Sequence, residues 1–217
     1  MVMNLVTSIV NPLVSAVLKL YGLSSQTVEI NPGTVIHFWA PRKTTPTNKN
    51  DDKNNKPALV LIHGFAGTGV LTWLPQVAAF AGRYAVYVPD LVFFGGSSST
   101  DDNRVRVPAF QAECLAIGLR RLGVEQCVVV GCSYGGIVGT AMAVESDPRL
   151  VRCLVLSNSN VGVTVSQSRA VFERVRVGSW AELLLPETVD CLKRLLRSVV
   201  VRRPWLPDWA YRHYLEV

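Results

Sequence analysis

The chain has 217 residues, of which 49% are hydrophobic and 18% are charged. Soluble proteins usually contain about 25% charged residues, so this balance excludes a disordered chain, a coiled coil and a collagen-like fibre. The net charge of +6 lies in residues 41–57 and 165–217, which carry +3 each. Because no basic face with interleaved aromatic residues accompanies the core pattern, we expect no nucleic-acid binding.

The five cysteines are too few for a small disulfide-stapled scaffold, and their number is odd. Most of them lie in apolar runs, and no pair has the spacing of a zinc site. We therefore expect reduced, buried thiols in an intracellular protein, most simply a cytoplasmic one. No metal and no organic cofactor is expected.

Residues 1–18 carry no charge and are mostly apolar. They lack the features of a secretory signal, and polar residues dilute them too much for a membrane span of about 20 apolar residues. Within residues 1–22 we expect an amphipathic helix with its N-cap at Asn11, Pro12 in its first turn and Gly22 at its end. Its apolar face packs on the domain in one interpretation and lies on a membrane surface in another. That face comprises Leu13, Val14, Val17, Leu18 and Tyr21.

A β-hairpin is predicted next. The β-rich runs 26–30 and 35–40 flank the turn sequence Asn31-Pro32-Gly33-Thr34. Residues 41–57 have no apolar period and predict a long exposed polar loop. This loop interrupts a core domain that we place at residues 23–164.

Strand and helix patterns alternate from residue 58. Strands are predicted at 58–62, 84–88, 126–130 and 151–156, and helices at 71–81, 107–122 and 135–145. Almost continuous apolar strands, each followed by a helix, predict an α/β fold with a doubly wound, mostly parallel sheet covered on both faces. The functional site of such a sheet lies at the carboxyl ends of its strands.

Only helical patterns follow residue 165. They occur at 169–177, 180–185, 189–201 and 209–215, with prolines between them, and predict a helical cap segment over residues 165–217. Its aromatic residues are interleaved with arginines. These helices pack on the core in one interpretation, and in another they contact a lipid surface or an acyl chain.

The sequence Gly131-Cys132-Ser133-Tyr134-Gly135 has the pattern G-x-S-x-G. It follows a predicted strand and opens a predicted helix, which is the context in which this pattern marks a nucleophile. The sharp turn forces Ser133 into a strained backbone conformation, and larger residues at Gly131 and Gly135 would collide. We therefore predict that Ser133 is a nucleophile.

A second glycine-rich loop, His63-Gly64-Phe65, follows the strand 58–62. A loop in this position can direct backbone N–H groups into the site, so we predict that the amides of Phe65 and Tyr134 form an oxyanion hole. His63 precedes the nucleophile in the chain, and we interpret it as a hydrogen-bonding loop residue and not as the catalytic base.

Phe93 and Phe94 follow the strand 84–88 and should lie near the mouth of the site. They suit the pocket of an apolar substrate, and packing in the core is the alternative.

Together these motifs resemble the α/β-hydrolase superfamily. His63-Gly64-Phe65, then Pro89-Asp90-Leu91 with Gly95-Gly96-Ser97, then the Ser133 turn stand in the order and spacing of that family. Within that family the chain resembles plant α/β-hydrolases that are similar to monoacylglycerol lipases and epoxide hydrolases. The resemblance covers about residues 20–160 and implies a serine esterase or lipase that acts on a small-molecule ester or lipid-like substrate through an acyl-enzyme. Serine at position 133 argues against epoxide hydrolase chemistry, which needs a carboxylate nucleophile.

The resemblance also implies an acid and a histidine on later loops. Asp147, Asp190 and Asp208 follow Ser133, and His213 is the one later histidine, but their helical or surface contexts do not fit. We therefore expect a truncated chain without the C-terminal strands, whose exposed sheet edge allows self-association. The alternative function is an inactive isoform or fragment that acts as a binding or regulatory module.

Overall fold

The computed structural model describes residues 5–42, 56–65, 67–100, 107–199 and 206–215. The chain forms two compact units, one ending at Val161 and the other beginning at Gly162. This division lies close to the expected boundary after residue 164. The predicted polar loop at 41–57 falls mostly outside the described residues.

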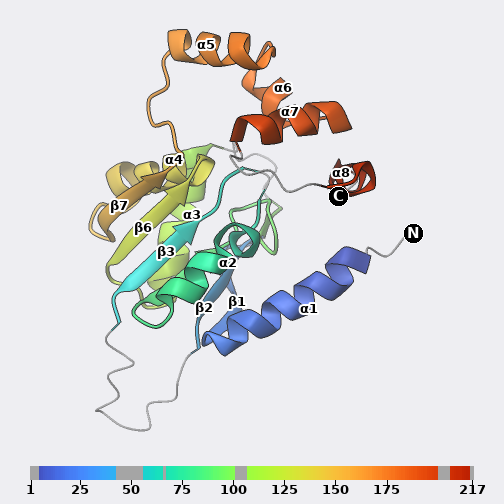
Figure 1. Ribbon diagram of the computed structural model, residues 1–217. Coiled ribbons are helices and arrows are strands. Elements are labelled where there is room, and N and C mark those ends of the chain that lie inside the picture. The colour runs from blue at the N-terminus through green and yellow to red at the C-terminus, as the bar shows by residue number, and fades with distance from the viewer. Residues whose placement is uncertain (1–4, 43–55, 66, 101–106, 200–205, 216–217) are drawn as a thin grey trace, which may run out of the picture. The chain divides into compact units, whose positions relative to one another are not determined.

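A mixed, mostly parallel sheet lies at the centre of the first unit (Figure 1). Its central strands run parallel in the order β4-β3-β6-β7, and the antiparallel hairpin β1-β2 joins them through β4. A short strand, β5, pairs with β2 and was not predicted. The strands are β1 (Leu23–Asn31), β2 (Thr34–Pro41), β3 (Ala58–Ile62), β4 (Ala85–Pro89), β5 (Ser98–Ser99), β6 (Cys127–Cys132) and β7 (Val151–Ser157).

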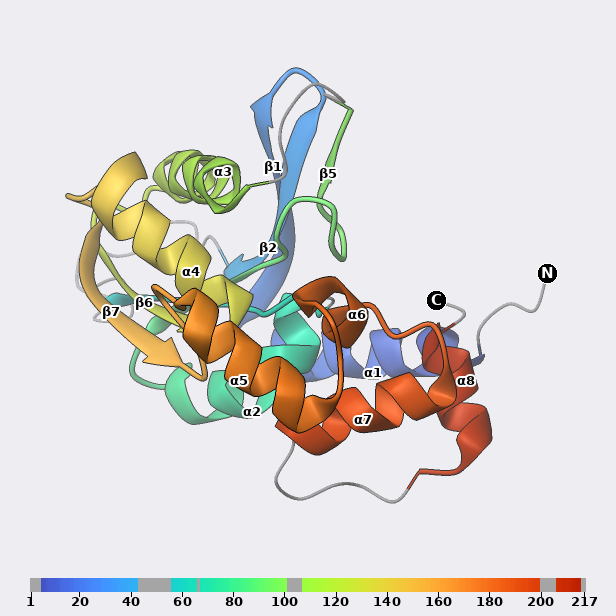
Figure 2. The ribbon, with the colours of Figure 1, turned by 90° about the horizontal axis from the view of Figure 1, so that it is seen from above.

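Helices cover both faces of this sheet. Helices α1 (Leu5–Leu20) and α2 (Gly69–Phe80) lie on one face, and α3 (Pro108–Arg121) and α4 (Tyr134–Ala141) lie on the other (Figures 1 and 2). The predicted α/β fold with a doubly wound, mostly parallel sheet is confirmed.

Each face of the sheet has its own apolar core. Leu59 to Ile62 of β3 are all buried, because helices pack above and below this central strand. The core beneath α3 and α4 includes Phe38, Leu115 and Val129, and the core beneath α1 and α2 includes Leu18, Trp39 and Trp73.

Helix α1 differs from the predicted helix at its beginning. It starts at Leu5, so Asn11 is not its N-cap and Pro12 lies inside it. The apolar residues before Asn11 continue the helical pattern, and this continuation outweighs the hydrogen bond that Pro12 cannot donate. The predicted end is confirmed, since Gly22 has a φ of +80°.

The predicted apolar face of α1 is only partly buried. Leu18 is fully buried and Val14 and Val17 are half-buried, whereas Leu13 and Tyr21 are exposed. The helix therefore rests on the sheet along a stripe that is narrower than predicted.

The cysteines also depart from expectation. Cys114 and Cys127 are buried, and burial raises the pKa of the Cys127 thiol to about 12. Cys153 is exposed, because β7 lies at the end of the strand order. The prediction of buried thiols is wrong for this residue.

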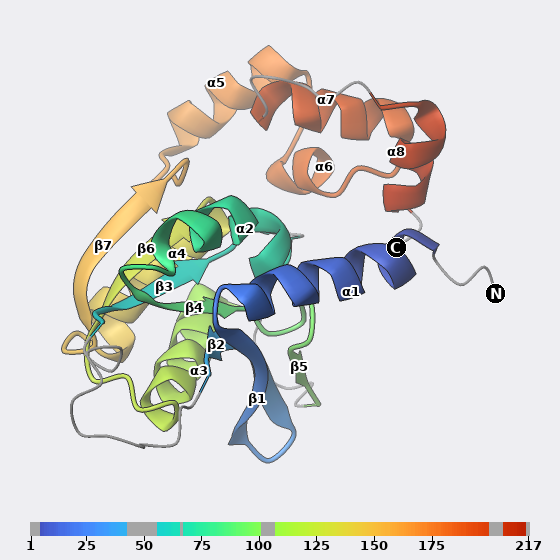
Figure 3. The same ribbon diagram turned by 60° about the horizontal axis from the view of Figure 1, so that its bottom comes forward.

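The second unit consists of helices in its described part (Figure 3). Thr164 and Gln167 form a reciprocal capping box at the start of the first helix, which explains why this helix begins four residues before the predicted one. Leu183 and Leu192 are buried within the unit. The helices are α5 (Val165–Val175), α6 (Trp180–Leu184), α7 (Val189–Val199) and α8 (Asp208–Leu215).

Candidate active site

Ser133 lies at the sharp turn between β6 and α4. Its backbone has φ 52° and ψ −119°, and the residue is exposed. A non-glycine residue with positive φ is uncommon, because its Cβ crowds the neighbouring carbonyl. The backbone N–H of Ser133 donates to the carbonyl of Ser157 at 3.0 Å, so the end of β7 holds this strained turn in place.

Two glycines make this turn possible, as the sequence predicted. A Cβ on Gly131 would lie 2.4 Å from the carbonyl oxygen of Gly135, and a Cβ on Gly135 would lie 2.4 Å from the carbonyl oxygens of Ile62 and His63. Such separations are far below van der Waals contact. Glycine therefore lets α4 begin directly against the end of β3.

The loop after β3 lies beside the same turn. A Cβ on Gly64 would lie 3.3 Å from the Cβ of Ser133. The ring of Phe65, which is 40% exposed, meets the ring of Tyr134 edge-on at 6.4 Å. Because Tyr134 is the first residue of α4, its N–H has no acceptor within the helix. Phe65 and Tyr134 thus lie together near Ser133, and the use of their amides as an oxyanion hole stays a prediction.

His63 is fully buried and joins two loops of the site. Its Nδ1 lies 2.7 Å from the carbonyl oxygen of Gly64, and its Nε2 lies 2.9 Å from the backbone N–H of Leu91. Since the N–H of Leu91 can only donate, Nε2 is the acceptor and Nδ1 carries the proton. Burial lowers the pKa of His63, so the ring is neutral.

Phe93 and Phe94 belong to the loop that follows β4. Both side chains are half-buried and pack against the core. The ring of Phe94 also meets the rings of His63 at 5.6 Å and Phe65 at 5.7 Å. Phe94 therefore connects the core with the exposed ring of Phe65 near Ser133, and its contact with substrate stays a prediction.

The loop after β4 is held by Asp90, to which the sequence analysis assigned no role. Its carboxylate accepts the backbone N–H groups of Gly69 at 2.8 Å and Gly96 at 3.0 Å, and it lies 3.0 Å from Nδ1 of His37. Burial alone would raise the pKa of Asp90, but these hydrogen bonds outweigh it and hold the pKa below its ordinary value. The sequence did carry one sign of this role of Asp90, the pair Gly95-Gly96 that follows it. A Cβ on Gly95 would lie 2.3 Å from the Asp90 carboxylate, so the loop needs glycine there.

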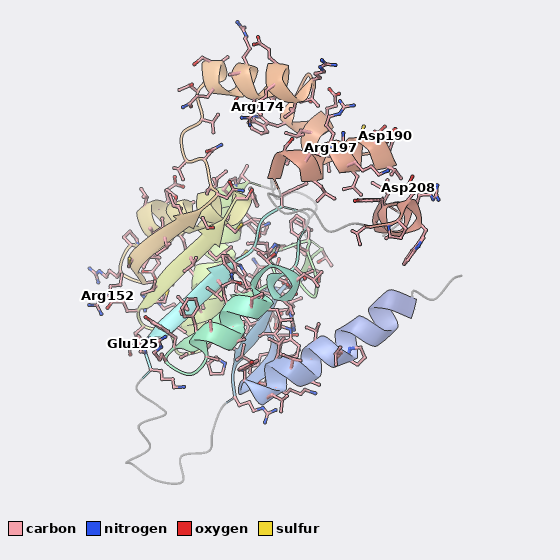
Figure 4. All side chains as sticks on the ribbon, viewed as in Figure 1. Glu125, Arg152, Arg174, Asp190, Arg197 and Asp208 are labelled. Carbon is pink, nitrogen blue, oxygen red and sulfur yellow. The ribbon has the colours of Figure 1, made fainter. Side chains whose placement is uncertain are left out.

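Two of the three aspartates that follow Ser133 pair with basic residues. Asp147 pairs with Arg120 at 2.8 Å, which lowers its pKa, and it lies beyond the far end of α4 and its π-helical extension, Met142–Ser146. At 1.5 Å per residue this places it about 20 Å from Ser133. In the second unit Asp208 pairs with Lys193 at 2.7 Å, and Asp190 lies in the first turn of α7 (Figure 4). His213 lies on α8, and its side chain is outside the described part of the structure.

Among the described residues, no cluster of three or more His, Cys, Asp or Glu side chains could hold a metal ion. Within the same residues, no helix combines the length and the apolar character needed to cross a membrane.

The chain is similar to several known hydrolases. It is 34% identical over 140 residues to pimeloyl-(acyl-carrier protein) methyl ester esterase from Aeromonas hydrophila, a match that covers 64% of this chain and 52% of that protein. It is 28% identical over 127 residues to 2-hydroxymuconate semialdehyde hydrolase from Pseudomonas sp. strain CF600, covering 56% and 43%. The chain thus spans about half the length of the curated relatives it matches.

Solved structures show the same fold. The crystal structure of a bacterial membrane phospholipase A superposes with a TM-score of 0.76 and 23% identity, covering 99% of this chain and 65% of that one. A family model described as the α/β hydrolase fold matches residues 57–181.

Proposed function

Because this chain belongs to the α/β-hydrolase fold family, we propose that it is a hydrolase whose Ser133 attacks a carboxylic ester or a related acyl group. The positive φ of Ser133 carries this proposal. Glycine would adopt such a conformation without strain, so a serine at this exposed turn indicates chemistry and not folding.

The proposed reaction passes through an acyl-enzyme. Ser133 Oγ bonds to the carbonyl carbon and loses its proton, which leaves on the departing alcohol, and the amides of Phe65 and Tyr134 stabilise the negative oxygen that forms. The N-terminus of α4 favours that charge. Expulsion of the alcohol leaves an acyl group on Ser133, which water then removes. The aromatic rings beside Ser133 favour an apolar, ester or lipid-like substrate, in keeping with the esterase and phospholipase among the similar proteins.

One observation favours a second candidate function. The two histidines whose side chains the structure describes use both ring nitrogens elsewhere: His63 in the loops of the site and His37 with Asp90 and Ser25. A serine without an adjacent base is a weak nucleophile. The alternative is therefore a binding or regulatory module that keeps the Ser133 turn without turnover.

A fluorophosphonate probe separates the two functions. We expect rapid labelling of Ser133 in the intact chain, located by mass spectrometry of its peptides, and its loss in Ser133→Ala. Ser157→Ala is the matched control, because it removes a nearby hydroxyl and keeps the backbone carbonyl that holds the turn. A folded chain that carries no label on Ser133 would favour the binding module.

Two further proposals concern partners. In the first, residues 1–22 associate peripherally with a membrane surface. In the second, copies of the chain associate through the edge of the sheet.

A further inference from the structure

A second set of serine, histidine and aspartate side chains lies outside the Ser133 turn. Ser25 is on β1, His37 is on the neighbouring strand β2, and Asp90 follows β4. The Oγ of Ser25 lies 2.9 Å from Nε2 of His37, and Nδ1 of His37 lies 3.0 Å from Oδ2 of Asp90. The three groups are therefore hydrogen-bonded in series.

The partners of Asp90 fix the direction of these hydrogen bonds. Its carboxylate receives the N–H groups of Gly69 and Gly96, which favour the ionised form, and an ionised carboxylate only accepts hydrogen bonds. Nδ1 of His37 must then carry the proton that it donates to Asp90. In the neutral imidazole the lone pair is on Nε2, so the hydroxyl of Ser25 donates to it.

This is the arrangement by which a base activates a serine. A carboxylate holds the imidazole in the required tautomer, and the other ring nitrogen is ready to accept the hydroxyl proton. Trp39 contacts the ring of His37 edge-on at 6.0 Å and helps to fix its orientation.

The histidine and the aspartate of this set are mostly buried, and the serine is exposed. The side chains of Asp90 and His37 are 7% and 14% exposed, whereas Ser25 is exposed. The base and its carboxylate are thus protected from water, and the hydroxyl is open to a small reagent. The Nε2 hydrogen bond to Ser25 is also not needed to hold the loop after β4, because Nδ1 and the two glycine amides already hold Asp90.

We infer that Ser25 is a second nucleophilic hydroxyl of this chain, activated by His37 and Asp90, and that it takes activated acyl esters. Ser25 Oγ forms a bond to the carbonyl carbon while its proton moves to Nε2 of His37. The tetrahedral intermediate then expels its leaving group as an alcohol, which takes that proton, and an O-acyl group remains on Ser25. Asp90 acts as a positioning residue that stabilises the transient imidazolium. Since an exposed hydroxyl on a sheet binds its substrate through few contacts, an ester with a good leaving group is the expected class.

A fluorophosphonate probe tests this inference when each labelled residue is located by mass spectrometry. In Ser133→Ala we expect label on Ser25, formed as fluoride leaves phosphorus. This label should disappear in the double variant Ser133→Ala/Ser25→Ala and persist when Ser24→Ala replaces Ser25→Ala, because Ser24 is the adjacent serine of the same strand. His37→Gln should slow the labelling of Ser25 by about 100-fold.

Two results would overturn the inference. One is a folded Ser133→Ala chain with no label on Ser25. The other is label on Ser25 that forms no faster than on the exposed Ser98 of β5 and that His37→Gln does not slow, which would mark a surface serine without a base. Because the peptide map scores Ser25 and Ser133 separately, failure at one leaves the result at the other intact.

Discussion

The role of His63 is ambiguous from the sequence, because a histidine near a predicted nucleophile could be its catalytic base. Its buried ring instead donates to the carbonyl of Gly64 and accepts from the N–H of Leu91. It therefore ties the loop after β3 to the loop after β4. A neutral, buried ring with both nitrogens occupied positions these loops and has no lone pair left for Ser133.

Gly135 is one of the residues at which the turn tolerates little change. We expect Gly135→Ala to lower the free energy of unfolding by about 2–3 kcal/mol, because its Cβ would lie 2.4 Å from two backbone oxygens. Gly82→Ala is the control: nothing lies within 4 Å of its Cβ, so its effect should stay within about 1 kcal/mol. Urea denaturation measures both, and equal effects would contradict the close approach of α4 to β3.

Asp90 should make the stability of the chain depend on pH. Its pKa in the folded protein is below the value of about 3.9 found in unfolded chains, so its contribution is complete above about pH 5 and is lost as the pH falls through the folded pKa. We expect Asp90→Asn to be less stable than the original chain at pH 7. The difference in the free energy of unfolding should narrow between pH 5 and pH 3.

Asp147→Asn is the control for this pH series. The pKa of Asp147 is also lowered, chiefly by Arg120, but the pair lies at the surface, where solvent screening leaves an ion pair little net effect on stability. Parallel stability curves for Asp90→Asn and the original chain would show that the Asp90 carboxylate is not held in its charged form.

At the scale of elements, few of the side chains of α1 that the structure describes pack on the rest of the domain. Leu18 is fully buried, whereas Leu20, two residues later, is 85% exposed. We expect Leu18→Ala to cost about 2–4 kcal/mol of stability and Leu20→Ala less than about 0.5 kcal/mol, as measured by thermal and urea unfolding. A small effect of Leu18→Ala would mean that α1 does not pack on the domain, and would favour the membrane-surface interpretation of residues 1–22.

The elements that the sequence predicted best are those with one strong pattern. The buried strand 58–62 matches β3 in full, because helices on both faces demand a continuous apolar run. The two-residue strand β5 has no such pattern, since its residues Ser98 and Ser99 are both polar and form a strand where they pair with β2. The start of α1 was misplaced because Asn11-Pro12 is a strong local start signal that the longer apolar pattern overrode.

The candidate site also has one part that the sequence predicts and one part that it does not. The Ser133 turn was predictable because glycine spacing and strand-helix context are both local in the sequence. The hydrogen bonds from Ser25 to His37 and from His37 to Asp90 were not predictable, because they join side chains that are 12 and 53 positions apart on β1, on β2 and in the loop after β4.

At the scale of the whole molecule, β7 is the strand that leaves an edge of the parallel sheet open. Among the described strands it pairs with β6 alone, and Val155 and Leu156 are 46% and 44% exposed. Arg152 projects outward from the same strand (Figure 4). Unpaired strand edges with apolar side chains favour pairing with another chain.

We therefore expect self-association that depends on this edge. Val155→Lys should shift the chain towards monomer in sedimentation velocity over a range of concentrations. Val144→Lys is the control, because Val144 is 68% exposed but lies in the π-helical turn after α4. If Val144→Lys dissociates the chain equally, or if the original chain is monomeric throughout, β7 is not the contact.

The order of strands also dictates the order of folding. The hairpin β1-β2 is closed by a short turn, but the inner neighbour of β2 is β4, with Phe38 opposite Pro89 and Trp39 opposite Val88. Contacts between residues this far apart form late, because the entropy of closing the intervening loop must be overcome first. In a chain that emerges from the ribosome, both strands of the hairpin are therefore available before β4 is synthesised. The same contact brings His37 to Asp90, so the hydrogen bond that holds the loop after β4 forms only when the two halves of the sheet join.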